Sequence, residues 1–467
     1  MHIQQLYTAC LSEAAYFIES NGESAIIDPM RDIDVYLELA KSRNAPIKYI
    51  FETHFHADFV SGHLDLSKQT GATIIYGPGA TTSFKVHNAA DGELFKLGDI
   101  SIEVIHTPGH TIESSCYLLR DENNKAHALF TGDTLFVGDV GRPDLSSGNM
   151  SSEELAGIMY DTIQNKILPL ADDVIIYPGH GAGSSCGKNI GPNTISTIAD
   201  EKKNNYALKA QTKEAFIEAV TSGLPIAPVY FAINAQINKA GYDGIDKVIE
   251  RGTQPLNLQA FKEKIKEDVI LLDSRPASEF TEGFIPGAVF IGLEGRFAEW
   301  AGSLLPFDKP IVLVTPAGME KETVTRLSRV GFDKMTGFLK GGFETWKNAG
   351  EKTDLIINVE ADELMMDIPH DPNLTVVDVR REAEYADGHL TDALNLPLNE
   401  MTDIAELAQF EDNQNLYVHC AGGYRSVIAT SLLKRQGVHN LRNVLGGWDK
   451  IKEQEKVSII KEASVLN

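Results

Sequence analysis

Histidine and aspartate side chains follow four β-like runs in the first half of the chain. The run IKYIFE leads into THFHAD, ISIEVI into HTPGH, HALF into TGD, and VIIY into PGH. Strand ends that feed polar loops gather functional groups at one edge of a scaffold. Imidazoles and carboxylates that converge there suit a first-row transition metal. The candidate residues are His54, His56, Asp58, His110, Asp133 and His180.

A second pattern with chemical potential lies near the C-terminus, where LYVH leads into CAGGYR and then into SVIATSLLKRQG. This order predicts a strand, a glycine-rich loop and a helix. Backbone N–H groups and a helix N-terminus favour a thiolate, and a nearby guanidinium adds positive charge. We therefore expect Cys420 to be a catalytic nucleophile assisted by Arg425. The substrate-binding candidates in this loop are Gly422, Gly423 and Tyr424.

Two further residues are candidates for contact with substrate. Arg142, in GRPD, could pair with a carboxylate of a thiol carrier, because its planar fork suits such groups. A structural salt bridge is the equal alternative. Cys186 follows His180 by six residues and is a candidate second thiol, which would accept or relay sulfur near the metal.

Length and composition limit the classes of protein that fit. The 467 residues suggest about three domains, and 43% apolar with 23% charged residues is an ordinary globular composition. No apolar run is long enough to cross a bilayer, and the N-terminus does not read as a secretory signal. The net charge, 42 minus 66 or −24, disfavours nucleic acid and membranes as partners. Four scattered cysteines suit a reducing compartment, so we expect a cytoplasmic protein.

The second half contains an internal repeat. LLDSRPASEF matches VVDVRREAEY, IVLVTPAG matches NLYVHCAG, and LKGGFETW matches VLGGWDKI. Each copy alternates strands with helices, which predicts two α/β domains with parallel sheets. Pro316 stands where the second copy has Cys420, so the first copy cannot carry sulfur covalently and is expected to be inactive. The predicted domains are residues 1–255, 256–355 and 356–467.

The first region resembles the metallo-β-lactamase superfamily, whose members are αββα sandwiches with the pattern HxHxDH, then His, Asp and His. One departure is Phe59, which replaces the last histidine of HxHxDH. In two-metal members such as the glyoxalase II type, that histidine helps to hold the second metal, so a one-metal site is favoured. HADF together with GDTLFVGDVGRPDL resembles the persulfide dioxygenases. That resemblance implies one iron(II) per chain, with zinc less suited because O₂ activation needs a redox-active metal.

The same resemblance assigns roles to the histidines and aspartates. It implies that His54, His110 and Asp133 bind the metal. His56, Asp58 and His180 would then orient ligands or water around it, or serve as further ligands.

The last region resembles the rhodanese sulfurtransferases, with DVR (378–380), CAGGYR and GGW in family order. The six residues from Cys420 to Arg425 have the loop length of the sulfur-handling members. The whole order resembles persulfide dioxygenase–rhodanese fusions of sulfide detoxification. That implies oxidation of a low-molecular-weight thiol persulfide by O₂ to sulfite, and conversion of sulfite and sulfane sulfur to thiosulfate at Cys420. The reverse transfer would use the same residues. Such proteins often assemble, so a homo-oligomer is expected.

Two other functions fit parts of the pattern. The first is a zinc-dependent thioester hydrolase of the glyoxalase II type with a sulfurtransferase domain, against which Phe59 counts. The second is a non-catalytic persulfide sensor or sulfur carrier. The sequence does not identify the thiol that carries the persulfide, and glutathione, coenzyme A and bacillithiol are the candidates.

Overall fold

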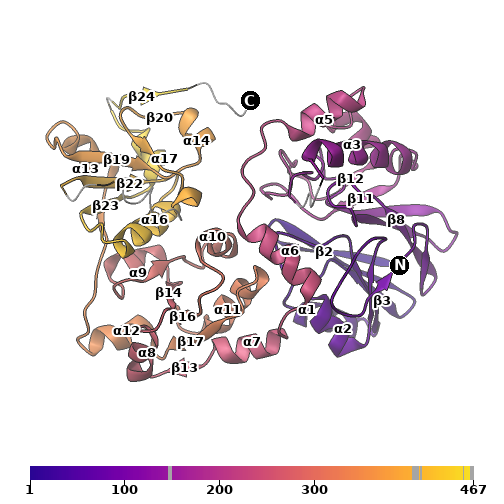
Figure 1. Cartoon of the computed structure of the whole chain (residues 1–467), viewed down its shortest axis with the longest axis horizontal. Coiled ribbons are helices and arrows are strands. Elements are labelled where there is room, and N and C mark those ends of the chain that lie inside the picture. Colours follow the sequence, from indigo (N-terminus) through magenta and orange to yellow (C-terminus); the bar gives the residue numbers. More distant parts are fainter. Residues whose placement is uncertain (146–149, 402–409, 411–412, 456, 463–467) are drawn as a thin grey trace. The chain divides into compact units, whose positions relative to one another are not determined.

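The structure is a computed structural model that describes residues 1–145, 150–401, 410, 413–455 and 457–462 (Figure 1). The chain divides into two compact units. The first contains Met1–Asp246 with the short segment Leu327–Gly331, and the second contains Lys247–Arg326 with Phe332–Asn467. The second unit holds two separate sheets of similar topology. The domain limits near 255 and 355 stay predictions.

The first unit is built on two six-stranded sheets. The first sheet runs in chain order through β1 (His2–Thr8), β2 (Glu13–Ser20), β3 (Glu23–Ile27), β4 (Ile47–Glu52), β5 (Thr73–Tyr76) and β6 (His87–Asn88). The second sheet runs through β7 (Leu94–Leu97), β8 (Ile100–His106), β9 (Ser115–Arg120), β10 (Ala126–Gly132), β11 (Ile175–Pro178) and β12 (Ser196–Thr197). Both sheets mix parallel and antiparallel pairs.

The two sheets bury a common core between them. Strand β8 shows how the sequence dictates this packing: Ile100, Ile102 and Val104 are buried, whereas the residues between them are only half-buried. This period of two places one face of a strand on the core. The buried residues pack with Tyr16 and Phe51 from the other sheet in one hydrophobic cluster.

Helices cover the outer faces of both sheets. Tyr36 and Leu66 pack in a cluster with residues of the first sheet, and Met159 and Phe216 pack in a cluster with residues of the second. The predicted αββα sandwich is therefore confirmed. The helices are α1 (Asp34–Ser42), α2 (His63–Thr70), α3 (Ser152–Thr162), α4 (Ile198–Asn204), α5 (Lys213–Thr221) and α6 (Tyr230–Ala240), with a π-helical turn over Ile163–Ile167.

The boundary between the units falls within α7 (Ile245–Gly252), since the second unit starts at Lys247. The second unit contains two five-stranded parallel sheets. The strands of the first of these sheets, in spatial order, are β13 (Pro255–Leu256), β17 (Met335–Leu339), β16 (Ile311–Val314), β14 (Ile270–Asp273) and β15 (Val289–Phe290). Those of the second are β18 (Ile357–Val359), β23 (Leu441–Val444), β22 (Asn415–His419), β19 (Leu374–Asp378) and β21 (Leu394–Asn395). The matching strand orders confirm the predicted repeat.

Helices connect the strands of each parallel sheet, as a parallel crossover requires. In the first copy they are α8 (Leu258–Lys264), α9 (Ala277–Glu282), α10 (Phe297–Leu304), α11 (Glu320–Arg329) and α12 (Gly342–Asn348). In the second they include α13 (Ala361–Asp367), α14 (Glu382–Ala386), α16 (Tyr424–Arg435) and α17 (Gly447–Ile451), and a small ribbon pairs β20 (His389–Leu390) with β24 (Ile459–Ile460). Within the described ranges, no helix has the length and apolar character needed to span a bilayer.

The repeat extends to a buried ion pair in each copy. Asp273 and Asp378 both end a central strand, and each is bound by the arginine two residues later. The closest contacts are 2.7 Å for Arg275 and 2.6 Å for Arg380. The sequence motif D-x-R thus has the same structural role in both copies.

Candidate metal centre and cysteine loop

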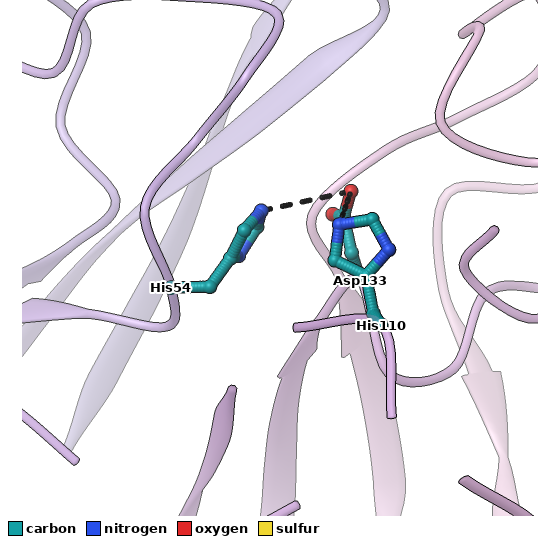
Figure 2. Close-up of side chains that lie close together, drawn as sticks. All are labelled: His54, His110 and Asp133. Carbon is teal, nitrogen blue, oxygen red and sulfur yellow. Dashed lines mark ion pairs between the residues drawn. The ribbon is translucent and has the colours of Figure 1, made fainter. Parts of the chain in front are cut away.

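The three predicted metal ligands lie together in the first unit (Figure 2). His54 follows β4, His110 follows β8, and Asp133 comes directly after β10. The Nε2 atoms of His54 and His110 are 3.8 Å and 3.5 Å from Oδ2 of Asp133. All three side chains are buried, and their ligand atoms lie within 4.8 Å of one another.

Hydrogen bonds fix which nitrogen of each imidazole carries the proton. Nδ1 of His110 lies 2.7 Å from the carbonyl oxygen of Arg142, which can only accept, so Nδ1 is the donor. Nδ1 of His54 lies 2.9 Å from Oγ1 of Thr53, whose own proton goes to Asp28 at 2.9 Å. The Nε2 atoms of both rings face the carboxylate of Asp133.

The carboxylate of Asp133 faces the Nε2 atom of His54, which is itself an acceptor when the ring is neutral. Both oxygens of Asp133 are buried and have no hydrogen-bond partner among the described residues. Burial and then the neighbouring imidazoles lower the pKa of His54 well below its usual value, so its ring is neutral. An unpaired buried carboxylate is costly, and a metal cation between the three atoms removes that cost. The residues present thus fit a metal ion held by two imidazoles and one carboxylate.

Close backbone packing supports the cluster from behind. A Cβ atom on Gly141 would lie 1.9 Å from the carbonyl oxygen of Asp133 and 3.0 Å from Nδ1 of His110. Only glycine allows the chain to pass this close to both ligands.

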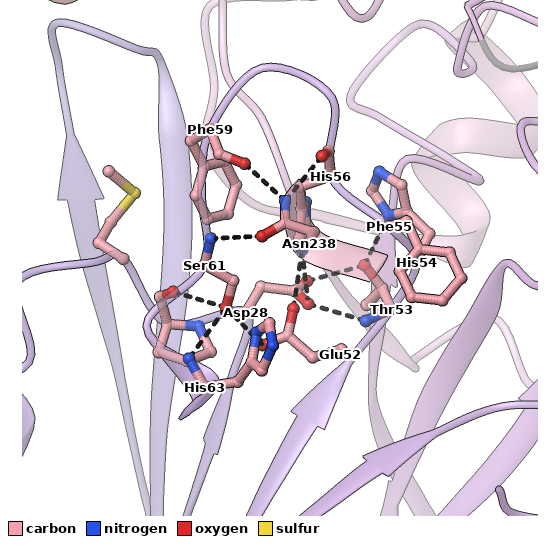
Figure 3. A network of polar contacts seen from close by, with 12 residues as sticks. Asp28, Glu52, Thr53, His54, Phe55, His56, Phe59, Ser61, His63 and Asn238 are labelled. Carbon is pink, nitrogen blue, oxygen red and sulfur yellow. Dashed lines mark hydrogen bonds and ion pairs between the residues drawn. The ribbon is translucent and has the colours of Figure 1, made fainter. Parts of the chain in front are cut away.

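His56 is not one of the three clustered ligands, although it shares the motif with His54. Figure 3 shows it beside Asp28 and Glu52. Its Nε2 is 3.0 Å from Oδ1 of Asp28 and 3.5 Å from Oε2 of Glu52. Burial by itself lowers the pKa of His56, but the two carboxylates raise it well above its usual value. The ring of Phe59 covers that of His56, with centroids 4.3 Å apart. His56 thus contacts these two carboxylates, and its predicted role around the metal stays a prediction.

Glu52 is the anionic centre of this network. Burial alone raises its pKa, but His63 and His56 lower it to about 2. Ser61 donates a hydrogen bond to Oε1 of Glu52 at 2.6 Å. Glu52 therefore stays charged at neutral pH, and its contact with Ser61 holds the loop that follows β4.

Asn238 of α6 ties the same loop to the rest of the first unit (Figure 3). Its Nδ2 donates to the carbonyl oxygens of His56 and Phe59, both at 2.8 Å, and its Oδ1 accepts from the amide of Ser61 at 3.0 Å. One buried side chain therefore satisfies three backbone groups on either side of Asp58.

The remaining predicted residues of this region gather beside Asp133. Nε2 of His180 lies 3.5 Å from both Oδ2 of Asp58 and Oδ1 of Asp133. The thiol of Cys186 joins Asp58 and His180, with ligand atoms within 4.8 Å of one another. The prediction that Cys186 lies near the metal cluster is consistent with this placement, and its role as a thiol relay stays a prediction.

Arg142 is engaged by the protein itself. Its guanidinium binds both oxygens of Asp144 at 2.7 Å and 3.0 Å and donates to the carbonyl oxygens of Ser185 and Pro225. Its backbone amide also donates to the carbonyl oxygen of Cys186 at 3.0 Å. These contacts are the structural salt bridge that the sequence left open, and they join the His110 loop to the Cys186 loop. Substrate binding by Arg142 stays a prediction.

The predicted thiolate loop is built at the end of β22 in the second unit. Cys420 follows the strand directly, and α16 begins at Tyr424. The amide of Gly423 donates to Sγ of Cys420 at 3.1 Å, and Gly423 adopts a left-handed conformation with φ of 105°. The backbone thus directs an N–H at the sulfur, as the sequence predicts.

The Gly-Gly-Trp motif closes this loop from behind. The amide of Trp448 donates to the carbonyl oxygen of Cys420 at 2.6 Å. A Cβ atom on Gly447 would lie 2.2 Å from that oxygen, so a side chain has no room there. Both glycines of the motif have positive φ. The motif is therefore a packing requirement of the cysteine loop.

The other two side chains of the loop have partners within the second unit. Arg425 forms two hydrogen bonds of 2.7 Å with the carboxylate of Glu384. The hydroxyl of Tyr424 donates to the carbonyl oxygen of Gly292 at 2.6 Å. The sequence did not reveal either contact, and the catalytic role of Arg425 and the substrate role of Tyr424 stay predictions.

Sequence reasoning missed four residues of these sites. Asp28 directly follows β3 and Glu52 is the last residue of β4, so the strand-end pattern could have found them. Asn238 and Glu384 lie in helices without any distinguishing motif. Their roles depend on contacts over 41 residues or more, which no local pattern encodes.

Comparison with known proteins identifies the parts of the chain. Residues 9–180 match the metallo-beta-lactamase superfamily, and residues 257–349 and 360–454 each match the rhodanese-like domain. A solved metallo-beta-lactamase from Staphylococcus aureus is 31% identical with a TM-score of 0.66, over 73% of this chain and 99% of that one.

Curated relatives carry the name of another activity. A probable hydroxyacylglutathione hydrolase from Schizosaccharomyces pombe is 33% identical over 35% of this chain, and this chain spans only 60% of that protein's length. The hydroxyacylglutathione hydrolase GloC of Haemophilus influenzae is 26% identical over 44% of this chain and 96% of its own length.

The sandwich fold, the buried histidine–aspartate cluster and these similarities agree. The chain belongs to the metallo-beta-lactamase superfamily, and two rhodanese-like domains follow its metallo-beta-lactamase fold.

Proposed function

We propose that this protein is a non-heme iron persulfide dioxygenase joined to a sulfurtransferase, and that it acts in sulfide detoxification. The observation that carries the proposal is the cluster of His54, His110 and Asp133, from which His56 is withdrawn into an ion pair with Asp28. Two imidazoles and one carboxylate are the donor set of non-heme iron oxygenases. The sulfurtransferase loop around Cys420 lies in the same chain and links the site to sulfur chemistry.

The residues around the cluster hold it ready for a metal. Thr53 and the carbonyl of Arg142 bind Nδ1 of His54 and His110, and these contacts direct both Nε2 atoms at Asp133. Asp133 supplies the negative charge. An iron(II) ion held there would supply the redox chemistry that O₂ activation needs and that zinc lacks. In the overall reaction, a thiol persulfide, O₂ and water give the free thiol, sulfite and protons, and the sulfane sulfur is oxidised while O₂ is reduced.

The second step takes place at Cys420. Its thiolate attacks the outer sulfur of another thiol persulfide, the S–S bond of that persulfide breaks, and the free thiol leaves. Sulfite then attacks the outer sulfur on Cys420, which releases thiosulfate and restores the thiolate. The amide of Gly423 points at Sγ of Cys420 and stabilises that anion. One chain that carries both activities raises the effective concentration of sulfite at the acceptor.

A second candidate function is thioester hydrolysis of the glyoxalase II type. The names of the curated relatives favour it, since those proteins are hydroxyacylglutathione hydrolases. Phe59 argues against it, because phenylalanine offers no lone pair where that type has a histidine.

Two substitutions test the proposed division of labour. His110→Ala should abolish O₂ uptake with glutathione persulfide and leave sulfur transfer from thiosulfate to cyanide unchanged. Cys420→Ser should abolish that transfer and change the oxidation product from thiosulfate to sulfite. The matched controls are His87→Ala, at an exposed histidine, and Cys10→Ser, and both should retain both activities. Enzymatic thiosulfate production by Cys420→Ser would refute the two-site scheme.

A further inference from the structure

Helix α16, which follows the cysteine loop, is bound along one face by the copy that lacks a thiol. The hydroxyl of Tyr424 donates to the carbonyl oxygen of Gly292 at 2.6 Å. Seven residues later, Oγ of Ser431 accepts from the amide of Phe290 at 3.0 Å. Positions seven apart share one face of a helix, so α16 presents that face to the end of β15. Both copies lie in the second unit, so the contact is internal to one compact unit.

The contact covers the edge of a sheet. Strand β15 is the last strand of its sheet, and edge strands leave backbone groups for a partner outside the sheet. Ser431, which is fully buried, supplies that partner for the amide of Phe290. The first copy is therefore built to receive α16 of the second.

The acceptor for Tyr424 is itself held by the first copy. The amide on each side of Gly292 donates to a carbonyl oxygen at the end of β14, at 3.0 Å for Ile291 and 3.2 Å for Leu293. The carbonyl oxygen of Leu293 accepts from Nη1 of Arg326 at 2.9 Å. The carbonyl of Gly292 thus has a fixed place in the first copy.

Tyr424 transmits this hold to the cysteine loop. It is the first residue of α16 and follows Gly423, whose amide donates to Sγ of Cys420 at 3.1 Å. Burial raises the pKa of Tyr424, so its hydroxyl keeps the proton that it donates. The loop has little packing of its own: a Cβ atom on Gly422 would meet no atom of the described residues within 4 Å, and one on Gly423 only the amide nitrogen of Gly446 at 3.6 Å.

We infer that Tyr424 is a positioning residue, through which the copy without a thiol keeps the amide of Gly423 directed at the sulfur of Cys420. A backbone N–H aimed at sulfur stabilises the thiolate, so loss of the tether should lower the share of thiolate and slow sulfur transfer. The inference rests on the proposed sulfurtransferase at Cys420 and is independent of the metal in the first unit. It holds whether or not the ring of Tyr424 also contacts substrate.

Alkylation of Cys420 by iodoacetamide across a range of pH tests the inference in the full-length protein, with mass spectrometry of the Cys420 peptide as the readout. Tyr424→Phe keeps the ring and removes the hydroxyl that binds Gly292. Its alkylation profile should move to higher pH, and sulfur transfer from thiosulfate to cyanide should slow about fivefold, as loss of one neutral hydrogen bond predicts. The matched control is Tyr385→Phe, since Tyr385 also donates at 2.6 Å to a backbone carbonyl, that of Ala393 in its own copy. An unmoved profile in Tyr424→Phe, or an equal movement in Tyr385→Phe, would overturn the inference.

A substitution in the copy without a thiol tests the same tether from the other side. Arg326→Ala removes the hydrogen bond to the carbonyl oxygen of Leu293 and should move the profile of Cys420 to higher pH as well. Glu322→Ala removes the ion pair that Arg326 forms along α11 but keeps the bond to Leu293, so it should leave the profile unchanged. No movement in Arg326→Ala, or equal movement in both variants, would contradict the tether. Absence of sulfur transfer in the unsubstituted protein would refute the sulfurtransferase, whereas the alkylation profiles decide the tether by themselves.

Discussion

Replacement of Asn238 by leucine is a direct test of how the loop that carries the histidine motif is held. Asn238 is 1% exposed and satisfies two carbonyl oxygens and one amide of residues 56–61. Leucine has nearly the same size but no polar atoms, so three buried backbone groups would lose their partner. Each such group costs about 1–3 kcal/mol, and we expect Asn238→Leu to destabilise the loop by at least about 3 kcal/mol.

Asn234 provides a matched control on the same helix. It is fully buried one turn earlier, and neither its Nδ2 nor its Oδ1 has a hydrogen-bond partner among the described residues. Replacing this side chain by leucine removes polar atoms that are not satisfied, so Asn234→Leu should be neutral or stabilising.

The assay must report on the first unit. All three tryptophans, Trp300, Trp346 and Trp448, lie in the second unit, so their fluorescence is unsuitable. Hydrogen exchange of peptides that cover residues 47–62 measures the opening of the loop directly. We expect exchange to accelerate by roughly a hundredfold in Asn238→Leu, since about 1.4 kcal/mol corresponds to a factor of ten. Equal acceleration in the two variants would refute the assigned role of Asn238.

Two further predictions concern the second unit, where tryptophan fluorescence can follow unfolding. Gly447→Ala should destabilise the second unit by more than about 1 kcal/mol, because the residue has φ of 52° and an added methyl group would meet the carbonyl oxygen of Cys420. The control is Gly422→Ala, where a Cβ atom meets nothing within 4 Å. An equal loss of stability in the two variants would count against this reasoning. Burial by itself raises the pKa of Glu384. Arg425 lowers it by a larger amount, so the pKa in the folded protein lies below the ordinary value of 4.5. The Glu384–Arg425 pair therefore stabilises the fold above about pH 4.5, and this stabilisation is lost as the pH falls below that value. The difference in unfolding midpoint between wild type and Glu384→Gln should shrink from pH 7 to pH 4. A constant difference would show that the pair does not act through charge.

The strand-end pattern indicated six candidate metal ligands, and only the resemblance to the persulfide dioxygenases selected three of them. His54, His110 and Asp133 each follow a buried β run, and the ends of these strands meet at one place in the sandwich. The two parallel α/β folds followed from the repeat, since each motif keeps its place on the sheet.

The separate fate of His56 could not be predicted in this way. Its position two residues after His54 suggests the same role, but its ring forms an ion pair with Asp28, which directly follows β3. The partner of Arg425 escaped prediction for a related reason, because Glu384 lies 41 residues away in a short helix. Charge pairing across the fold decided both outcomes, and local sequence does not record it.

For Cys186, the sequence predicted the region of the fold but not the neighbouring side chains. The sequence placed this residue near the metal cluster by its distance from His180, but not as a companion of Asp58. That proximity depends on the backbone contact with Arg142, which brings two loops together. The position of Cys186 in the sequence thus indicated where the residue lies, but not which side chains it contacts.

The most direct test of the central claim is O₂ uptake by protein purified without oxygen, given glutathione persulfide, with bound metals measured on the same sample. The dioxygenase assignment predicts about one iron per chain and O₂ consumption that yields sulfite or thiosulfate. Zinc in place of iron in the first cluster, with hydrolysis of a glutathione thioester and no O₂ uptake, would contradict it and establish the hydrolase instead.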